Sequence, residues 1–166
     1  MSKLIIVCGL GGSGKTTTAK ALSKKMNIVC FYKDSLKAAL FDELEFSTND
    51  TYKLFFKLAE EQIKNNIDLI IEAPFVYRED IKLIDNWLKK YRVNLFCVIC
   101  EIDEKIRTQR IEVRPRHICH AKADIRLKEK TEKELFDFLQ LPGKHIKVST
   151  NKSIDNIVSQ IISEIK

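Results

Sequence analysis

The feature that most constrains this 166-residue chain is an octapeptide at residues 9–16, Gly-Leu-Gly-Gly-Ser-Gly-Lys-Thr. An apolar run precedes it, and a segment with Ala19, Leu22 and Met26 at helical spacing follows it. Strand, glycine loop and helix in this order form the setting in which G-x-x-x-x-G-K-[ST] binds phosphate. Glycines let backbone N–H groups converge on phosphate oxygens, and the helix start adds its dipole. We therefore expect residues 9–16, called the glycine loop below, to bind phosphates. The alternative is an ordinary glycine-rich turn with an exposed lysine.

The residues of the glycine loop have separate expected roles. The Lys15 ammonium is expected to reach the β- and γ-phosphates of a nucleotide, and the Thr16 hydroxyl to bind Mg²⁺. The residues predicted to contact the nucleotide here are Gly11, Gly12, Ser13, Gly14, Lys15, Thr16 and Thr17.

Length and composition predict one domain, residues 1–166, of ordinary globular character. No apolar run is long enough to cross a membrane, and the N-terminus lacks the apolar core and cleavage site of a signal peptide. The five cysteines are an odd number, which favours reduced thiols. We therefore expect a cytoplasmic protein with no membrane partner; composition says nothing of its oligomeric state.

The net charge of +6 is concentrated in one segment. Residues 105–133 hold ten lysines and arginines against four acidic residues, so the rest of the chain is balanced. A nucleic-acid binder can spread basic residues over a wide face, whereas a local excess suits a compact polyanion such as nucleotide phosphates.

Hydrophobic periodicity predicts strands that alternate with helices. The strands are expected at residues 3–8, 27–32, 67–72, 93–100 and 146–149. The helices are expected at 15–25, 34–44, 49–65, 81–91, 104–114 and 154–165. Residues 122–139 are either one helix or contain a helix start at Thr131. This order predicts a three-layer α/β fold: a five-stranded parallel sheet with helices on both faces and ligands at the carboxyl ends of the strands.

Two carboxylates follow predicted strands at that edge. Asp34 comes just after the second strand, where a carboxylate can accept the proton of a hydroxyl that receives a phosphoryl group. The alternative for Asp34 is a helix N-cap. Glu72 ends the third strand, where a carboxylate can hold Mg²⁺ through water. Its alternative is an ordinary acidic residue at a strand end.

Three arginines share one face of the helix predicted after the fourth strand. Arg107, Arg110 and Arg114 lie at i, i+3 and i+7, and Arg116 follows Pro115. Guanidinium groups bind phosphate oxygens through paired donors. We therefore expect a helical lid over about residues 105–133, in which Arg110 and Arg114 neutralise charge on the transferred group. The alternative is a solvated basic face.

Two further patterns resemble metal or redox motifs. His117 and His120 flank Cys119, but no second ligand cluster has the spacing of a metal site, so a loop that contacts substrate, or nothing, is the better interpretation. Cys97 and Cys100 lie three apart in a predicted strand, so they should point to opposite faces of the sheet as core residues.

Together these stretches resemble the small P-loop kinases, in particular the branch with chloramphenicol phosphotransferase, phage polynucleotide kinase and uncharacterised ATP-binding proteins. The resemblance covers nearly the whole chain and rests on residues 9–16, 33–37, 70–75 and 107–120. It implies strand order 2-3-1-4-5, ATP and Mg²⁺ as cofactors, and phosphoryl transfer to a hydroxyl group. It also implies a base at Asp34 and contact between the adenine and the loop at Thr150 and Asn151.

The resulting prediction is an ATP-dependent kinase of a small hydroxylated molecule. Lys37 stands where the polynucleotide kinases have an arginine for the substrate phosphate, so it keeps the charge but lacks the planar fork. A nucleic-acid 5′-hydroxyl kinase is therefore the second hypothesis. A nucleotide-binding regulatory ATPase without an acceptor is the third.

Overall fold

The computed structural model describes residues 1–45, 51–75, 78–115, 117–120 and 140–166. The strands are β1 (Ser2–Cys8), β2 (Cys30–Tyr32), β3 (Leu69–Glu72), β4 (Val93–Glu101) and β5 (Lys144–Ser149). The helices are α1 (Lys15–Met26), α2 (Lys33–Leu44), α3 (Thr51–Lys64), α4 (Arg78–Lys90), α5 (Glu104–Val113), the 3₁₀ turn η1 (Ile118–His120) and α8 (Ile154–Ile165). The helix expected within 122–139 and Arg116 lie outside the described residues.

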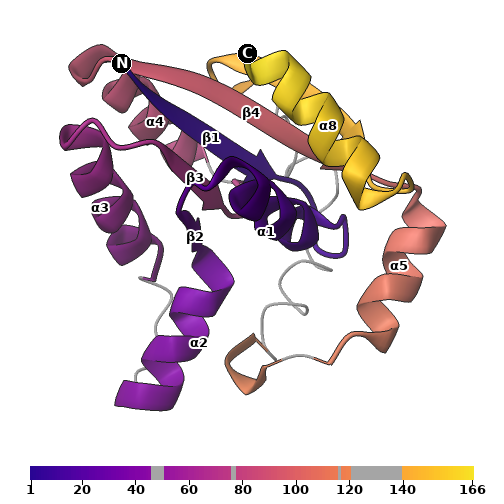
Figure 1. The fold of residues 1–166 in the computed structure, drawn as a ribbon. Helices are drawn as coiled ribbons and strands as arrows, with labels where there is room; N and C mark the ends of the chain where they lie inside the picture. Colours follow the sequence, from indigo (N-terminus) through magenta and orange to yellow (C-terminus); the bar gives the residue numbers. More distant parts are fainter. Residues whose placement is uncertain (46–50, 76–77, 116, 121–139) are drawn as a thin grey trace.

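The five strands form one parallel sheet in the order β2-β3-β1-β4-β5 (Figure 1). This confirms the predicted α/β fold and strand order. The register pairs Val7 of β1 with Glu72 of β3, and Glu72 in turn with Tyr32 of β2. Three neighbouring strands therefore end side by side, and the segments that follow them start at one edge of the sheet.

Helices cover both faces of the sheet (Figure 1). One hydrophobic core joins the sheet to α3 and α4, and the other joins it to α1 and α8. Cys97 belongs to the first core and Cys100 to the second, so the prediction that they point to opposite faces is confirmed. Both thiols are buried, and burial raises the pKa of each to about 12.

Two strands begin later than the sequence pattern predicts, and both predicted starts are wrong for the same reason. Asn27 adopts a left-handed φ of 55° and ends α1, so β2 starts at Cys30 rather than at residue 27. Asn66 has a φ of 58° in the turn after α3, so β3 starts at Leu69. Asparagine tolerates this conformation better than most residues, and both turns shorten the strand that follows.

Two helices begin with a side-chain N-cap. The Asp103 carboxylate accepts a hydrogen bond from the Lys105 N–H, and the Ser153 hydroxyl accepts one from the Asn156 N–H. The first cap fixes the start of α5, the helix that carries the predicted lid arginines.

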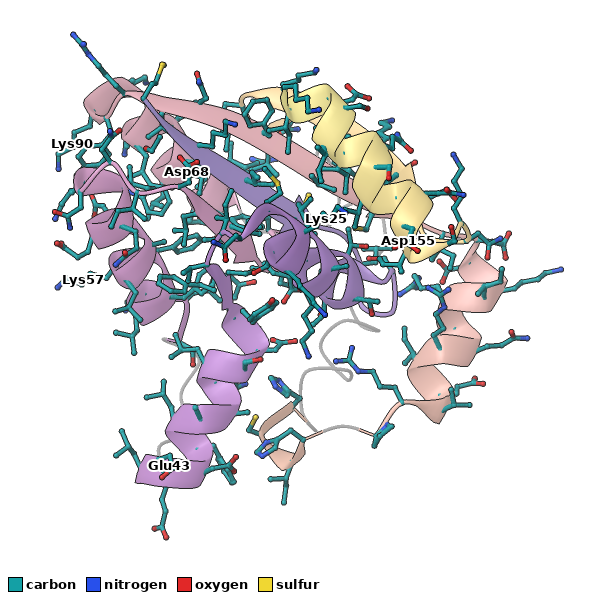
Figure 2. The ribbon with its side chains drawn as sticks, viewed as in Figure 1. Lys25, Glu43, Lys57, Asp68, Lys90 and Asp155 are labelled. Atoms are coloured by element: carbon teal, nitrogen blue, oxygen red, sulfur yellow. The ribbon has the colours of Figure 1, made fainter. Side chains whose placement is uncertain are left out.

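Helix α2 and helix α5 extend from the carboxyl edge of the sheet on two sides of α1 (Figure 1). None of the residues of α2 is fully buried, and Glu43 lies toward the end of α2 that is distant from the sheet (Figure 2). Within the described residues, we find no helix with the length and apolar character that a bilayer crossing requires.

Candidate active site

The glycine loop runs from the end of β1 to the start of α1 and needs its glycines for steric reasons. Gly12 has a φ of 80°, and a Cβ atom there would lie 2.9 Å from the carbonyl oxygen of Arg107. Gly14, with a φ of 86°, ends the loop directly before α1. Residues with a Cβ atom rarely adopt these backbone angles, so the loop conformation depends on glycine at both positions.

Lys15, Thr16 and Glu72 meet at the carboxyl ends of β1 and β3. The Lys15 Nζ atom lies 3.8 Å from Glu72 Oε1 and 3.3 Å from the Leu10 carbonyl oxygen. The Thr16 hydroxyl donates to the same Glu72 oxygen at 3.3 Å. Lys15 is 6% exposed and Glu72 is 2% exposed, so this is a buried ion pair. The structure therefore joins the three residues that the sequence assigned to phosphate and magnesium.

The Glu72 carboxyl has a raised pKa. Burial is the main cause, and the charge of Asp34 raises the pKa further, while Lys15 and the Thr16 hydrogen bond oppose the shift. A carboxyl group in this state gains from any cation placed next to it, because a cation stabilises its ionised form.

Asp34 lies in the first turn of α2, two residues beyond the end of β2. The helix begins at Lys33 with Tyr32 in the cap position, so the alternative of Asp34 as the N-cap is not what the structure has. The Lys33 Nζ atom lies 2.6 Å from Asp34 Oδ1. Burial acts to raise the pKa of Asp34, but the Lys33 ion pair, aided by His120 and Lys15, outweighs it and lowers the pKa. Asp34 is therefore ionised at neutral pH.

The residues at this edge fit a nucleoside triphosphate with Mg²⁺. The Ser13 hydroxyl is buried and has no hydrogen-bond partner within the described part of the chain. It lies in the glycine loop, beside the N-terminus of α1, where anions bind. The Thr16 hydroxyl and the Glu72 carboxylate are the oxygen donors that Mg²⁺ prefers, and Mg²⁺ usually completes its shell with phosphate oxygens and water.

Two of the predicted arginines fasten α5 to the glycine loop and to Thr150. Arg107 Nη1 donates to the Gly11 carbonyl oxygen at 3.0 Å. Arg110 donates to the carbonyl oxygen and the hydroxyl of Thr150 at 3.3 and 3.4 Å. The Thr150 hydroxyl donates to the Ser13 carbonyl oxygen at 2.7 Å. The loop after β5 and the helix α5 are therefore both tied to the glycine loop.

Two predicted residues stand apart from these contacts. Arg114 is exposed at the C-terminal end of α5 and makes no hydrogen bond or ion pair with the described residues. Thr17 is exposed on the first turn of α1. The structure thus brings Arg107 and Arg110, but not Arg114, to the glycine loop.

The turn that contains the two histidines packs on α2. His117 Nε2 lies 3.0 Å from Asp42 Oδ1, and His117 Nδ1 lies 3.0 Å from Cys119 Sγ. The His120 ring forms a hydrogen bond with the backbone of Asp34, and burial lowers the pKa of His120. The sequence left open whether these histidines contact anything at the site; the structure places His120 beside the predicted base.

Lys33 lies beside Asp34 and over the Tyr52 ring, although the sequence pattern did not assign Lys33 or Tyr52 to the site. Lys33 Nζ lies 5.1 Å from the centroid of the Tyr52 ring as well as against Asp34. The available signal was the position of Lys33, directly before a carboxylate that follows a strand. Tyr52 carried no such signal, because its helical spacing is equally typical of a core residue.

A shallow hollow of about 360 Å³ lies between α3 and α4. Tyr52, Phe56 and Leu83 contribute to its mainly apolar wall. It contains none of the residues predicted to bind nucleotide or magnesium, so the chemistry points to the carboxyl edge of the sheet rather than to this hollow.

Comparisons with known proteins agree with this fold. A family model described as an AAA domain matches residues 4–136. The cytidylate kinase of Methanobrevibacter smithii is 32% identical over 143 residues, which cover 78% of this chain and 74% of that protein.

Two solved structures share the arrangement of strands and helices. A candidate kinase from Chloroflexus aurantiacus has a TM-score of 0.81 and 23% identity, with 99% of each chain covered. The APS kinase of Mycobacterium tuberculosis, solved with AMPPNP and APS, has a TM-score of 0.64 and 20% identity, covering 99% of this chain and 97% of its own. At these identities, the likeness establishes a common fold.

Proposed function

The chain belongs to the AAA-domain family, as a small P-loop kinase, and from this we propose that it transfers a phosphoryl group from ATP to a hydroxyl group of a small molecule in a Mg²⁺-dependent reaction. One observation carries the proposal. The buried pair of Lys15 and Glu72 forms one cluster with the Thr16 hydroxyl, and the charge of Asp34 acts on both members of the pair. A cation, a hydroxyl and two carboxylates at the N-terminus of a helix suit the positioning of phosphate and metal.

In this proposal, the glycine loop and the residues around it bind ATP and Mg²⁺. ATP bound with Mg²⁺ supplies the phosphoryl group that is transferred. Lys15 and the backbone N–H groups of the loop hold the phosphates, and the buried Ser13 hydroxyl provides one more donor. Thr16 and Glu72 hold the metal ion. Arg107 and Thr150, which are tied to the loop, form the side next to the base and sugar.

Asp34 holds the acceptor in this proposal. Its carboxylate accepts the hydrogen of the acceptor hydroxyl and takes the proton as that oxygen bonds to the γ-phosphorus of ATP, while the bond from that phosphorus to the β–γ bridging oxygen breaks and ADP leaves. Because its pKa is low, Asp34 is a weak base that is fully ionised at neutral pH. Its main contribution is therefore orientation of the hydroxyl, as expected where positioning supplies most of the catalysis.

The arginines of α5 complete the site from the other side. Arg110 lies next to Thr150 at the glycine loop, where a guanidinium can offset negative charge on the transferred group. Arg114, one turn further along, is exposed. It would contribute to the site only when the lid closes over the nucleotide. We therefore propose a lid role for residues 105–133, with Arg110 contributing most.

The test uses purified protein, ATP and Mg²⁺. Lys15→Ala should abolish Mg²⁺-dependent ATP binding in calorimetry, whereas Lys20→Ala, an exposed position on the same helix, should leave it unchanged. Asp34→Asn should keep ATP affinity and lose transfer to hydroxylated metabolites in a screen with labelled ATP. Absence of ATP binding, or equal binding by Lys15→Ala, would contradict the proposal.

A second candidate acceptor is the phosphate of a nucleoside monophosphate. The 32% identity to a cytidylate kinase favours it. A phosphate acceptor has no hydroxyl proton to lose at neutral pH, so Asp34→Asn should then leave much of the rate. Transfer to CMP that survives Asp34→Asn would select this acceptor over a hydroxyl. Labelling of 5′-hydroxyl oligonucleotides would select a nucleic-acid kinase, and ATP hydrolysis unaffected by every acceptor would select a regulatory ATPase.

A further inference from the structure

Lys33 lies between the predicted base and an aromatic ring. Its Nζ atom is 2.6 Å from Asp34 Oδ1 and 5.1 Å from the centroid of the Tyr52 ring. The Lys33 side chain is 14% exposed, whereas that of Asp34 is 49% exposed. The lysine is thus enclosed, and the carboxylate that it contacts faces solvent on its open side.

The Tyr52 ring is held in place by buried aromatic side chains of its own helix. Its centroid lies 6.5 Å from that of Phe55 and 5.7 Å from that of Phe56. Phe55 is fully buried and Phe56 is 6% exposed. A lysine side chain is flexible on its own, but a cation over an aromatic face is restrained by the ring quadrupole. Helix α3 therefore restrains an ammonium group that belongs to the first residue of α2.

The ammonium is needed there because two carboxylates share this edge. Asp34 and Glu72 are close enough for the charge of Asp34 to act on Glu72, and Glu72 is buried while Asp34 is half exposed. Like charges in such surroundings favour uptake of a proton by one of them. Lys33 offsets this at Asp34, while Lys15 offsets it at Glu72.

Lys33 also decides which oxygen of the carboxylate is available. The Asp34 side chain contacts the Lys33 ammonium through its Oδ1 atom. Among the described residues, no other donor contacts the Asp34 carboxylate, so Oδ2 remains for a ligand. An oxygen that is fixed on one side and open on the other suits a hydroxyl that must be held in one direction.

We propose that Lys33 is a positioning residue of the transfer reaction: seated on the Tyr52 ring, its ammonium holds one oxygen of the Asp34 carboxylate and leaves the other for the acceptor hydroxyl. This inference rests on the proposed function, because it assigns Lys33 a task only if Asp34 holds the acceptor. It predicts that removal of the ammonium weakens transfer through Asp34 and leaves ATP binding intact.

The first experiment measures Asp34 directly and needs no substrate. Carboxyl carbons labelled with ¹³C are titrated by NMR in the natural protein and in Lys33→Met, Lys33→Arg and Lys64→Met. The Asp34 midpoint should rise in Lys33→Met, because the cation that lowers the pKa is gone. It should return toward the natural value in Lys33→Arg. Lys64→Met removes an equal charge from an exposed pair with Glu61 and should not move it.

Two variants of the ring keep the proposal testable if Lys33→Met fails to fold. Tyr52→Phe retains the aromatic face and should leave the Asp34 midpoint in place. Tyr52→Leu removes the face and should raise the midpoint, because Lys33 loses its restraint. An Asp34 midpoint in Lys33→Met equal to that of the natural protein would overturn the inference. If Lys33→Met does not fold, an unchanged midpoint in Tyr52→Leu would overturn it.

The second experiment follows Mg²⁺-dependent hydrolysis of ATP, with water as the acceptor. Lys33→Met should lower kcat by about tenfold, a part of the roughly 10²–10⁴-fold that a positioned acid–base group contributes, with KM for ATP unchanged and rescue by Lys33→Arg. The lower-pH limb of the rate profile should shift to higher pH. If the natural protein turns over ATP but Lys33→Met has equal kcat, the inference fails and the proposed function stands. If the natural protein neither binds nor turns over ATP, both fail.

Discussion

Breaking the buried pair between Lys15 and Glu72 offers the sharpest energetic test of the site. The pair is formed in the protein without nucleotide, at 3.8 Å between Nζ and Oε1, with both side chains less than a tenth exposed. The perturbations are Lys15→Met, Glu72→Gln and the double variant. Met matches the length of the lysine stem, and Gln can still accept the Thr16 hydrogen bond, so each change removes mainly charge.

The distance sets the expected magnitude. Two unit charges 3.8 Å apart interact with about 4 kcal/mol at an effective dielectric constant of about 20. Removing one member of a buried pair costs about 3–5 kcal/mol, because the remaining charge is left uncompensated. Lys15→Met should fall in that range, since it leaves Glu72 facing the charge of Asp34. Glu72→Gln should cost little or nothing, because burial and Asp34 penalise the ionised Glu72 carboxyl more than Lys15 favours it, and Asp34 still faces Lys15 in the variant.

Equilibrium unfolding in urea at pH 7, without nucleotide, measures these free energies. The double variant should be more stable than the sum of the two single changes predicts, by about 2–3 kcal/mol. Additive costs, within about 0.5 kcal/mol, would show that the two side chains do not interact. That result would remove the electrostatic basis of the site as described here. A Lys15→Met variant less costly than Glu72→Gln would contradict the role given to Asp34.

Two further predictions concern the glycine loop and pH. Gly12→Ala should destabilise the protein by about 1–3 kcal/mol, because its Cβ meets the Arg107 carbonyl at 2.9 Å and its φ is 80°. Gly11→Ala is the matched control, because a Cβ atom there has nothing within 4 Å. An equal decrease in the melting temperature of both variants would contradict the steric argument. Because burial raises the pKa of Glu72 above its ordinary value of 4.5, the folded state binds more protons than the unfolded state above pH 4.5. Glu72 thus contributes stability that is present below pH 4.5 and is lost as pH rises through its folded pKa. The free energy of unfolding, measured by urea titration at a series of pH values, should show this decrease in the natural protein and not in Glu72→Gln.

The linear order of strands and helices followed directly from the sequence pattern. Unbroken apolar runs such as residues 4–8 are typical of strands buried on both faces, and both faces of β1 are indeed buried. Helices with apolar residues at 3.6 spacing, such as α8, were equally plain. Strand ends were less predictable, because Asn27 and Asn66 end their helices through a left-handed conformation that hydrophobic patterning does not report.

Within the site, local motifs and long-range contacts differ in how far sequence can predict them. The glycine loop is a contiguous motif whose spacing fixes its backbone, so residues 9–16 could be assigned from the sequence alone. Asp34 and Glu72 could be placed at the same edge because each follows a strand. The charge partners could not, because they depend on which strands are neighbours and on how side chains turn: Lys33 against Tyr52 joins α2 to α3.

The sequence by itself determined that a phosphate-binding loop joins a buried strand to a helix, and that carboxylates and arginines follow strands at the same edge. Both depend on short-range spacing, which steric rules and hydrophobic burial translate directly into backbone structure. The tertiary structure alone decided which of those groups touch. It paired Glu72 with Lys15, tied Arg110 to Thr150 and set Lys33 between Asp34 and an aromatic ring. Such contacts join residues distant in the chain, and the electrostatic state of each carboxyl group depends on burial and neighbours that only the packed fold supplies.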